Sequence, residues 1–384
     1  MTRVAPPASR VLLVSSAAGA YGADRATSML ARRLSQRGWT LTVMVPLQGP
    51  LVNELSAARI PVVIADPGVV RLLFRPLSWT RFLLFGLPAS VVRVARLARG
   101  VDVVHVNTAV VVGAVLGGWL ARRPVVLHVR ESFQAHERVW RLYARIVRGM
   151  VTRVLAVSTE IAEECRRAGF RSVHLVHDGV EQMEVLTREE HGDLPVVVSI
   201  GRLNAWKGHE VLVDAVGRLE HEGLAVRVEI AGDPFPGGEH FLSRLEAHIS
   251  GQGLADRVQL LGFVSDVREI LRHASVFVLA STRPEPFGLA LVEAMAAGVP
   301  CIATAHGGPV DIIEHGRSGL LVPPADATEL ADAIRSVVTD RALQSALASG
   351  GAAAAREFTA DRVVDRVTDH YRAVLAGPAS ARQP

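Results

Sequence analysis

The sequence alternates short runs of β-branched and aliphatic residues with longer amphipathic stretches along most of its length. This alternation is typical of repeated β-α-β units, which build a parallel sheet covered by helices on both faces. The expected strands are residues 10–14, 41–45, 62–65, 103–106, 125–129, 154–157 and 174–176, and then 196–200, 226–231, 258–261, 276–279, 301–303 and 320–322. Expected helices include residues 24–36, 159–168, 327–349 and 360–376.

One interruption divides this pattern into two halves. Asp178-Gly179 and the polar segment 181–193 carry neither signal, and a chain of 384 residues suits roughly two domains. Each domain is expected to be a doubly wound α/β sheet, the two facing one another, and such sheets bind ligands at the carboxyl ends of their strands. We predict an N-terminal domain over 1–180, a linker over 181–194, a C-terminal domain over 195–358 and a final helix and tail over 359–384.

The composition excludes several classes of protein. Apolar residues make up 49% of the chain, as in globular proteins, and a net charge of +4 does not require a nucleic-acid partner. Two cysteines, Cys165 and Cys301, are too few for a disulfide framework and indicate reduced, buried side chains in a cytoplasmic protein. Residues 1–9 do not resemble a signal peptide. The uncharged run 103–121 is interrupted by polar residues and glycines, so we expect a buried strand and a packed helix there rather than a membrane span.

Lys207 is the only lysine in the sequence, and every other basic residue apart from histidine is an arginine. It lies in Gly201-Arg202-Leu203-Asn204-Ala205-Trp206-Lys207-Gly208, directly after the expected strand 196–200. A compact ammonium group suits a phosphate oxygen, and Arg202 adds a second cation to the same turn. A helix is expected to begin near Gly208, and its first N–H groups would complete a pyrophosphate site. A solvated basic turn is the alternative, which is disfavoured because both charges follow a buried strand.

A second loop follows the expected strand 276–279 and reads Thr282-Arg283-Pro284-Glu285-Pro286-Phe287-Gly288. Its two prolines keep Glu285 extended and outside the helix expected over 289–297. Glu293 lies about one turn inside that helix among small and apolar residues, where a carboxylate is costly unless it is paired or bound to a ligand. A glutamate on the solvent-exposed side of the helix is the alternative.

Two glycine loops also follow expected strands. The first is Gly19-Ala20-Tyr21-Gly22-Ala23-Asp24, and the second is Gly307-Gly308-Pro309. Glycines let the backbone approach a ligand closely, but the first loop lacks the dinucleotide spacing, and the sole lysine cannot belong to a Walker A motif. A tight turn and a ligand contact explain each loop about equally well.

These motifs together resemble the retaining glycosyltransferases of GT-B architecture, the large family-4 type (glycosyl transferases group 1). The resemblance rests on Gly201-Arg202…Lys207-Gly208, Pro284-Glu285-x-Phe287-Gly288-x(4)-Glu293-Ala294, Gly298-x-Pro300 and Gly307-Gly308. It covers essentially the whole chain. It implies two facing Rossmann-like domains and a final helix that crosses back to the N-terminal domain.

The resemblance also implies roles for particular residues. Arg202 and Lys207 would bind the diphosphate of the donor. Glu293 would hold the ribose hydroxyls, and Glu285 would contact the donor sugar. His128, which otherwise reads as a core or edge residue at the end of a strand, matches the active-site histidine of the first domain. The remaining donor-binding residues would be Gly22, Phe263, Phe287, Gly288 and Leu289, with Phe263 near the nucleobase.

Four positions depart from the family pattern. Tyr21 stands where a second glycine is frequent, and Asp24 stands where glutamate is usual. His128 is followed by Val129-Arg130-Glu131 rather than by the commoner acidic neighbour, and Asp311 replaces a frequent glutamate. These departures weaken inferences about the acceptor side and leave the diphosphate site intact.

The implied reaction transfers a sugar from a nucleotide diphosphate sugar, of UDP or GDP type, to an acceptor hydroxyl with retention of the anomeric configuration. Charge develops on the diphosphate leaving group, and two side-chain cations with a helix terminus would stabilise it. The sequence has no Asp-x-Asp loop and no His/Cys cluster with ligand spacing, so we expect no metal and no other cofactor. His128 would position the sugar. The implied setting is bacterial cell-surface polysaccharide or glycolipid synthesis, with a carbohydrate or lipid-linked acceptor.

The segment 69–99 carries six arginines and no acidic residue, with the apolar stretch 82–87 at its centre and Trp79 beside it. Such a pattern suits a helix lying on an anionic membrane surface. A buried helix with solvated arginines fits equally well. Membrane contact would place the protein on the inner face of the cell membrane and would favour a lipid-linked acceptor.

Two other functions would use the same donor site. A nucleotide-sugar 2-epimerase would need no acceptor, and a non-catalytic nucleotide-sugar-binding protein would show no turnover. The presence of both Glu285 and His128 disfavours the non-catalytic reading. A dehydrogenase is disfavoured by the missing dinucleotide fingerprint.

Overall fold

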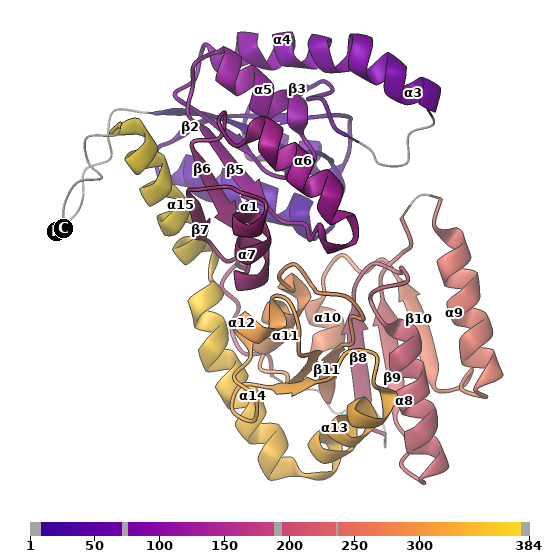
Figure 1. Cartoon of the computed structure of the whole chain (residues 1–384). Helices are drawn as coiled ribbons and strands as arrows, with labels where there is room; N and C mark the ends of the chain where they lie inside the picture. Colours follow the sequence, from indigo (N-terminus) through magenta and orange to yellow (C-terminus); the bar gives the residue numbers. More distant parts are fainter. Residues whose placement is uncertain (1–8, 71–75, 188–193, 236, 378–384) are drawn as a thin grey trace, which may run out of the picture. The chain divides into compact units, whose positions relative to one another are not determined.

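The computed structural model describes residues 9–70, 76–187, 194–235 and 237–377 (Figure 1). Residues 1–8, part of the expected linker and the end of the expected tail therefore lie outside the described residues. The chain divides into two compact domains: the first contains the residues up to Gly179 and those from Ala360 onward, and the second is Val180–Thr359. The chain crosses between the domains twice, and the Val180 amide donates to the Phe358 carbonyl at 2.9 Å.

The first domain is built on a parallel sheet of seven strands in the order β3-β2-β1-β4-β5-β6-β7. The strand order reverses between β1 and β4, and ligands of doubly wound sheets bind beside such a switch point. The strands are β1 (Arg10–Val14), β2 (Thr40–Val45), β3 (Val62–Ile64), β4 (Val103–Val106), β5 (Val125–Val129), β6 (Arg153–Ala156) and β7 (Val173–Leu175).

Helices cover both faces of this sheet (Figure 1). They are α1 (Gly22–Gln36), α2 (Pro50–Ala57), α3 (Pro76–Arg81), the π-helical η1 (Phe82–Gly86), α4 (Leu87–Ala98), α5 (Val112–Leu120), η2 (Gln134–His136), α6 (Glu137–Val147), α7 (Thr159–Arg167) and α15 (Ala360–Leu375). The uncharged run 103–121 forms β4 and α5, as predicted. Within the described parts of the chain, no helix is both long and apolar enough to cross a bilayer.

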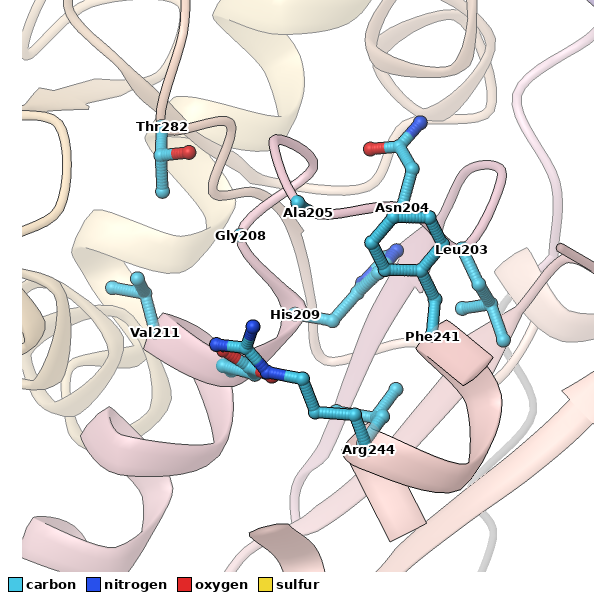
Figure 2. A pocket seen from close by; sticks show the side chains of 11 residues that line it. Leu203, Asn204, Ala205, Gly208, His209, Val211, Phe241, Arg244 and Thr282 are labelled. Carbon is cyan, nitrogen blue, oxygen red and sulfur yellow. The ribbon is translucent and has the colours of Figure 1, made fainter. Parts of the chain in front are cut away.

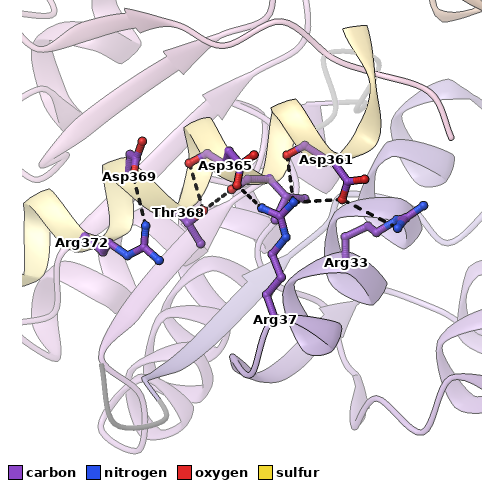
Figure 3. Close-up of polar contacts among 8 residues, drawn as sticks. Arg33, Arg37, Asp361, Asp365, Thr368, Asp369 and Arg372 are labelled. Carbon is purple, nitrogen blue, oxygen red and sulfur yellow. Dashed lines mark hydrogen bonds and ion pairs between the residues drawn. The ribbon is translucent and has the colours of Figure 1, made fainter. Parts of the chain in front are cut away.

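The last helix, α15, completes the core of the first domain. Its buried residues Val364, Val367 and Tyr371 share one apolar cluster with α1 and β1. At the rim of this contact, Arg37, which follows α1 directly, forms ion pairs with Asp361, at 2.9 Å, and with Asp365 (Figure 3). Although α15 follows the second domain in the sequence, apolar burial and these ion pairs attach it to α1 and β1 of the first domain.

The second domain has a parallel sheet of six strands in the order β10-β9-β8-β11-β12-β13, which reverses between β8 and β11. The strands are β8 (Val196–Ile200), β9 (Arg227–Ala231), β10 (Val258–Gly262), β11 (Val276–Leu279), β12 (Cys301–Thr304) and β13 (Leu320–Val322). The helices are α8 (His209–His221), α9 (Glu239–Gly251), α10 (Arg268–Leu271), α11 (Leu289–Ala296), α12 (Pro309–Ile312), α13 (Ala327–Thr339), α14 (Arg341–Ala355) and η3 (Arg356–Phe358).

The predicted fold class, two doubly wound parallel-sheet domains, is confirmed, and each expected strand is present within about one residue at either end. Cys165 and Cys301 are free and buried, as predicted. The single helix expected over 327–349 was wrong, because the chain forms α13 and α14 there. Asp340 separates them: its carboxylate accepts hydrogen bonds from the amides of Ala342 and Leu343 at 2.9 and 3.0 Å, an N-cap that starts a new helix.

The attachment of α15 should depend on pH through His370. Its Nδ1 lies 2.9 Å from Nη1 of Arg153, and since a guanidinium only donates, this nitrogen accepts and the ring is neutral. Burial, His174 and Arg153 lower the pKa of His370 from 6.5 to about 4. This contribution to stability is therefore complete above pH 6.5 and is lost as the pH falls toward 4.

Thermal unfolding midpoints between pH 7.5 and 4 check this expectation. The midpoint of the wild type should fall more steeply than that of His370→Gln, which keeps an acceptor for Arg153 but cannot gain a proton. His221→Gln, on the exposed end of α8, should follow the wild type. Parallel curves for the wild type and His370→Gln would contradict the assignment.

Candidate functional site

The loop after β8 presents Lys207 beside the first turn of α8. Oδ1 of Asn204 accepts hydrogen bonds from the amides of Trp206 and Lys207, at 3.1 and 3.0 Å, and closes the turn. Gly208 then caps α8 with φ +71°, and a Cβ added there would lie 1.8 Å from the Ala280 carbonyl oxygen. Only glycine therefore fits where the loop meets the helix. The Lys207 ammonium lies 4.7 Å from the centre of the Trp206 ring.

The loop after β11 brings Glu285 to this lysine. Nζ of Lys207 donates to Oε2 of Glu285 at 2.7 Å, and the two side chains are only 14% and 8% exposed. The amide of Thr282 donates to the Trp206 carbonyl at 2.7 Å and ties the two loops together. Because β8 and β11 flank the switch point of the sheet, two motifs that are 78 residues apart in the sequence form one ion pair.

Ser281 is a member of this site that the sequence analysis missed. Its hydroxyl is fully buried and donates to Oε2 of Glu285 at 2.9 Å. Its own carbonyl accepts hydrogen bonds from Oγ1 of Thr304, at 2.9 Å, and from Nε2 of His306, at 2.8 Å. Lys207 and Ser281 thus both donate to Oε2 and orient the carboxylate. The only signal in the sequence was a serine two residues after β11.

The second glycine loop, Gly307-Gly308-Pro309, contacts the backbone of Glu285. The amide of Gly308 donates to the Glu285 carbonyl at 2.7 Å, and Gly307 pairs with Glu285 as an isolated bridge. Gly307 has φ +68°, and a Cβ there would lie 2.2 Å from the Glu285 oxygen. A Cβ at Gly308 would lie 2.1 Å from the Phe287 oxygen. The close approach that these glycines permit is therefore to the Glu285 loop itself.

The other predicted residues of the second domain lie at the start of α11, after β8 and after β10. Glu293 lies one turn inside α11 and is 5% exposed, which excludes the solvent-exposed alternative. Gly288 caps this helix with φ +110°, directly before Leu289. Phe287 is buried against Phe358, with the ring centres 5.7 Å apart. On other strands of the same sheet, Arg202 follows β8, and Phe263, which is 47% exposed, follows β10.

A small pocket of about 60 Å³ lies against the lysine loop (Figure 2). The side chains that line it include Asn204, His209, Phe241 and Arg244, and neither Lys207 nor Glu285 is among them. Burial and the charge of Lys207 lower the pKa of His209 to about 4, so this ring is neutral at physiological pH. The pocket adjoins the ion pair without containing it.

In the first domain, Gly22 begins α1 beside the switch point, whereas His128 lies within β5 and is fully buried. The ring of His128 packs 5.4 Å from that of His105, and Nδ1 of His105 lies 2.6 Å from the Tyr371 hydroxyl on α15. Burial and the positive charge of Arg130 hold the pKa of His128 well below its ordinary value. His128 is therefore a neutral interior histidine in this structure.

Arg130 is a second residue that the sequence analysis did not assign. It forms a buried ion pair with Asp178, and its Nε donates to Oδ1 of Asn107 at 2.9 Å. Its Nη2 lies 3.4 Å from Nδ1 of His128, which accepts because arginine only donates. The unusual Val129-Arg130-Glu131 sequence thus has a structural reason, since Arg130 neutralises an aspartate that stands directly before the first crossing between domains.

Comparison with known protein families identifies the families that the two domains match. Residues 20–182 match the family described as Glycosyltransferase Family 4, and residues 186–353 match the family described as Glycosyl transferases group 1. Each family model covers one of the two domains, and the chain is a glycosyltransferase of GT-B architecture. The resemblance drawn from the Arg202, Lys207, Glu285 and Glu293 motifs is thereby confirmed.

Individual relatives of this glycosyltransferase are similar over part of their length. Mannosylfructose-phosphate synthase of Agrobacterium fabrum is 34% identical over 193 residues, covering 48% of this chain and 41% of that protein. The lipopolysaccharide core biosynthesis glycosyltransferase LpsE of Rhizobium meliloti is 34% identical over 184 residues, covering 48% and 50%. The matches span half or less of either relative. HepE of Anabaena, solved with UDP and glucose, shares the fold, with a TM-score of 0.81 and 24% identity over 94% of this chain and 99% of HepE.

The packing of the lysine loop predicts a difference between two glycines of positive φ. Gly208→Ala should destabilise the protein by well over the roughly 1 kcal/mol that a left-handed alanine costs, because its Cβ also meets the Ala280 oxygen. Gly223→Ala, with φ +83° and nothing within 4 Å of its added Cβ, should lose only the conformational part. Urea unfolding of both variants measures the two free energies, and equal losses would refute the close approach.

Proposed function

We propose that this glycosyltransferase transfers a sugar from a nucleotide diphosphate sugar to an acceptor hydroxyl with retention of the anomeric configuration. The observation that carries the proposal is the Lys207–Glu285 ion pair, in which the cation proposed to bind phosphate and the carboxylate proposed to bind the sugar are 2.7 Å apart. HepE was crystallised with UDP and glucose and with UDP-glucose, which supports a donor of UDP type. A GDP-type donor would use the same phosphate-binding residues.

The leaving diphosphate sets the main catalytic requirement. Arg202, Lys207 and the free N–H groups at the start of α8 stabilise the charge that develops on it. These groups supply the positive charge from the protein itself, and we propose that the reaction needs no metal. Without donor, Lys207 is balanced by Glu285, so a bound diphosphate shares the ammonium with this carboxylate.

The remaining donor contacts follow from the positions of the other residues. Oε1 of Glu285 accepts from a sugar hydroxyl while Oε2 stays on Lys207 and Ser281. Glu293 binds the ribose hydroxyls, and the exposed ring of Phe263 lies near the nucleobase. The backbone around Gly22 and from Phe287 through Gly288 to Leu289 completes the donor site.

For His128 we propose a positioning contact with the donor sugar. Since Nδ1 accepts from Arg130, the proton of the neutral ring is on Nε2, which can donate to a sugar hydroxyl. This contact requires the ring to become accessible, because it is fully buried in this structure.

The acceptor is proposed to be a carbohydrate or a lipid-linked carbohydrate in bacterial cell-surface polysaccharide or glycolipid synthesis. LpsE, a similar protein, is named for lipopolysaccharide core biosynthesis. Within the segment 69–99, Arg71 and Arg75 lie outside the described residues, but η1 exposes Leu83, Leu84 and Phe85 by 52%, 65% and 70%. Exposed apolar side chains in an acid-free segment support a cytoplasmic protein that contacts the anionic inner face of the membrane through it.

Thermal shifts with UDP, GDP, ADP and dTDP test the phosphate site. One nucleotide at ~100 times its dissociation constant should stabilise the wild type by about 2.7 kcal/mol. Lys207→Ala should lose this shift, measured from its own ligand-free midpoint because the substitution also leaves Glu285 without its cation. Lys207→Arg restores the charge and should recover part of the shift. No shift with any nucleotide in the wild type would refute the assignment.

Product analysis separates the transferase from its rivals. The transferase releases nucleoside diphosphate in proportion to the acceptor consumed. A nucleotide-sugar 2-epimerase would convert the donor without any acceptor, and a binding protein would show a thermal shift but no product.

Substitution of Ser281 should impair the use of the sugar donor without weakening the binding of the nucleoside diphosphate. Ser281→Ala removes the hydroxyl that orients Glu285, and the loss of one hydrogen bond to a charged group should lower kcat/KM for the donor sugar about tenfold. The affinity for the nucleoside diphosphate alone should not change. Ser318→Ala removes another buried serine hydroxyl of the same domain, one that binds the Glu314 amide, and controls for stability. Equal losses in kcat/KM and in the affinity for the nucleoside diphosphate would reduce Ser281 to a packing role.

A further inference from the structure

The solvent side of α6 carries an apolar stripe. Val139, Leu142 and Ile146 are 52%, 61% and 55% exposed. Their spacing of three and four residues places them on one face of the helix. Large aliphatic side chains scattered singly are ordinary on a protein surface, but three aligned on one helix form a continuous patch.

The opposite side holds α6 firmly on the first domain. Trp140, Ala144 and Val147 are buried. The indole of Trp140 stacks on Phe133, with ring centres 4.3 Å apart and planes 7° apart, and on Tyr143, at 5.2 Å and 13°. The helix is therefore anchored by an aromatic stack, and the exposure of its apolar stripe belongs to the folded domain.

A basic stripe runs beside the apolar one. Arg138, Arg141, Arg145 and Arg148 are exposed and follow one another at intervals of three, four and three residues. The one acidic residue of α6 is Glu137, which pairs with Arg141 at 3.0 Å. The exposed side of α6 thus combines aliphatic surface with an excess of positive charge.

We propose that this face of α6 docks on the surface of an anionic lipid bilayer, with the aliphatic stripe in the acyl boundary and the arginines on the lipid phosphates. The charge decides between a bilayer and a second copy of the chain. A two-fold interface would bring the arginine stripes of two copies together, which is repulsive. An anionic headgroup layer instead complements the arginines.

This surface is separate in sequence from the segment 69–99, and it does not depend on the donor site. It provides the first domain with a bilayer contact whose residues are all described by the structure. A lipid-linked acceptor is the substrate class that such a contact would serve.

Co-sedimentation of the full chain with phosphatidylglycerol and with phosphatidylcholine vesicles tests the proposal. Arg141→Gln with Arg145→Gln should weaken binding to phosphatidylglycerol about thirtyfold, since each arginine near the surface contributes roughly 1 kcal/mol. Leu142→Gln with Ile146→Gln should weaken it at least about tenfold. Arg218→Gln and Val310→Gln, at exposed positions of the second domain, are the matched controls and should bind as the wild type.

Four outcomes would overturn the proposal. The first is wild-type binding by both α6 variants, above all if Leu84→Gln with Phe85→Gln abolishes it and shows that η1 is the bilayer contact. The second is absence of binding by the wild type, and the third is equal binding to both lipids. The fourth is an α6-dependent dimer in light scattering without any effect on vesicles, which would assign the face to a second copy. The nucleotide thermal shift should be intact in every α6 variant, so a failed donor site is recognised separately.

Discussion

The ion pair between Lys207 and Glu285 is held in place by the strand order and by three loops of the second domain. It exists because β8 and β11 are neighbours at the point where the strand order reverses, although the two loops are 78 residues apart in the chain. Gly208 lets the lysine loop meet α8, and Gly307 and Gly308 let a third loop hydrogen-bond to the backbone of Glu285. A buried ion pair is stable only with good geometry and further hydrogen bonds, and the Ser281 hydroxyl supplies one of these. In the function proposed above, the same cation and carboxylate bind the diphosphate and the sugar of the donor.

The first domain handles buried charge differently. Arg130 and Asp178 neutralise each other in its interior, and Asn107 accepts from the same guanidinium. The acidic partner of Arg130 is Asp178, which comes from the last residues of the domain before the first crossing. The positive charge and the burial together keep His128 neutral. The helix α15 joins this interior through the contact between Tyr371 and His105.

The fold could be predicted almost entirely from the sequence because strand and helix periods are local. Every expected strand is present, and the error at 327–349 arose where a polar residue, Asp340, starts a new helix inside an alanine-rich stretch that would otherwise favour one continuous helix. The residues of the proposed donor site could also be singled out from the sequence, because lysine, arginine and glutamate in loops after buried strands are costly without a role. Ser281 and Arg130 were not predictable, since a short hydroxyl and one arginine among many carry no local signal. The exposed apolar face of α6 was missed for a related reason: a sequence does not show which side of an amphipathic helix is covered.

By itself, then, the sequence determined the two parallel-sheet domains, the loops proposed to bind the donor and the resemblance to GT-B glycosyltransferases. Only the tertiary structure decided which of those side chains meet: Lys207 with Glu285, Ser281 with the same carboxylate oxygen, and Arg130 with Asp178. The physical reason is that backbone propensities and burial periods act over a few residues, whereas an ion pair is fixed by the order of strands in a sheet. That order results from the packing of the whole domain, and the sequence around either partner does not reveal it.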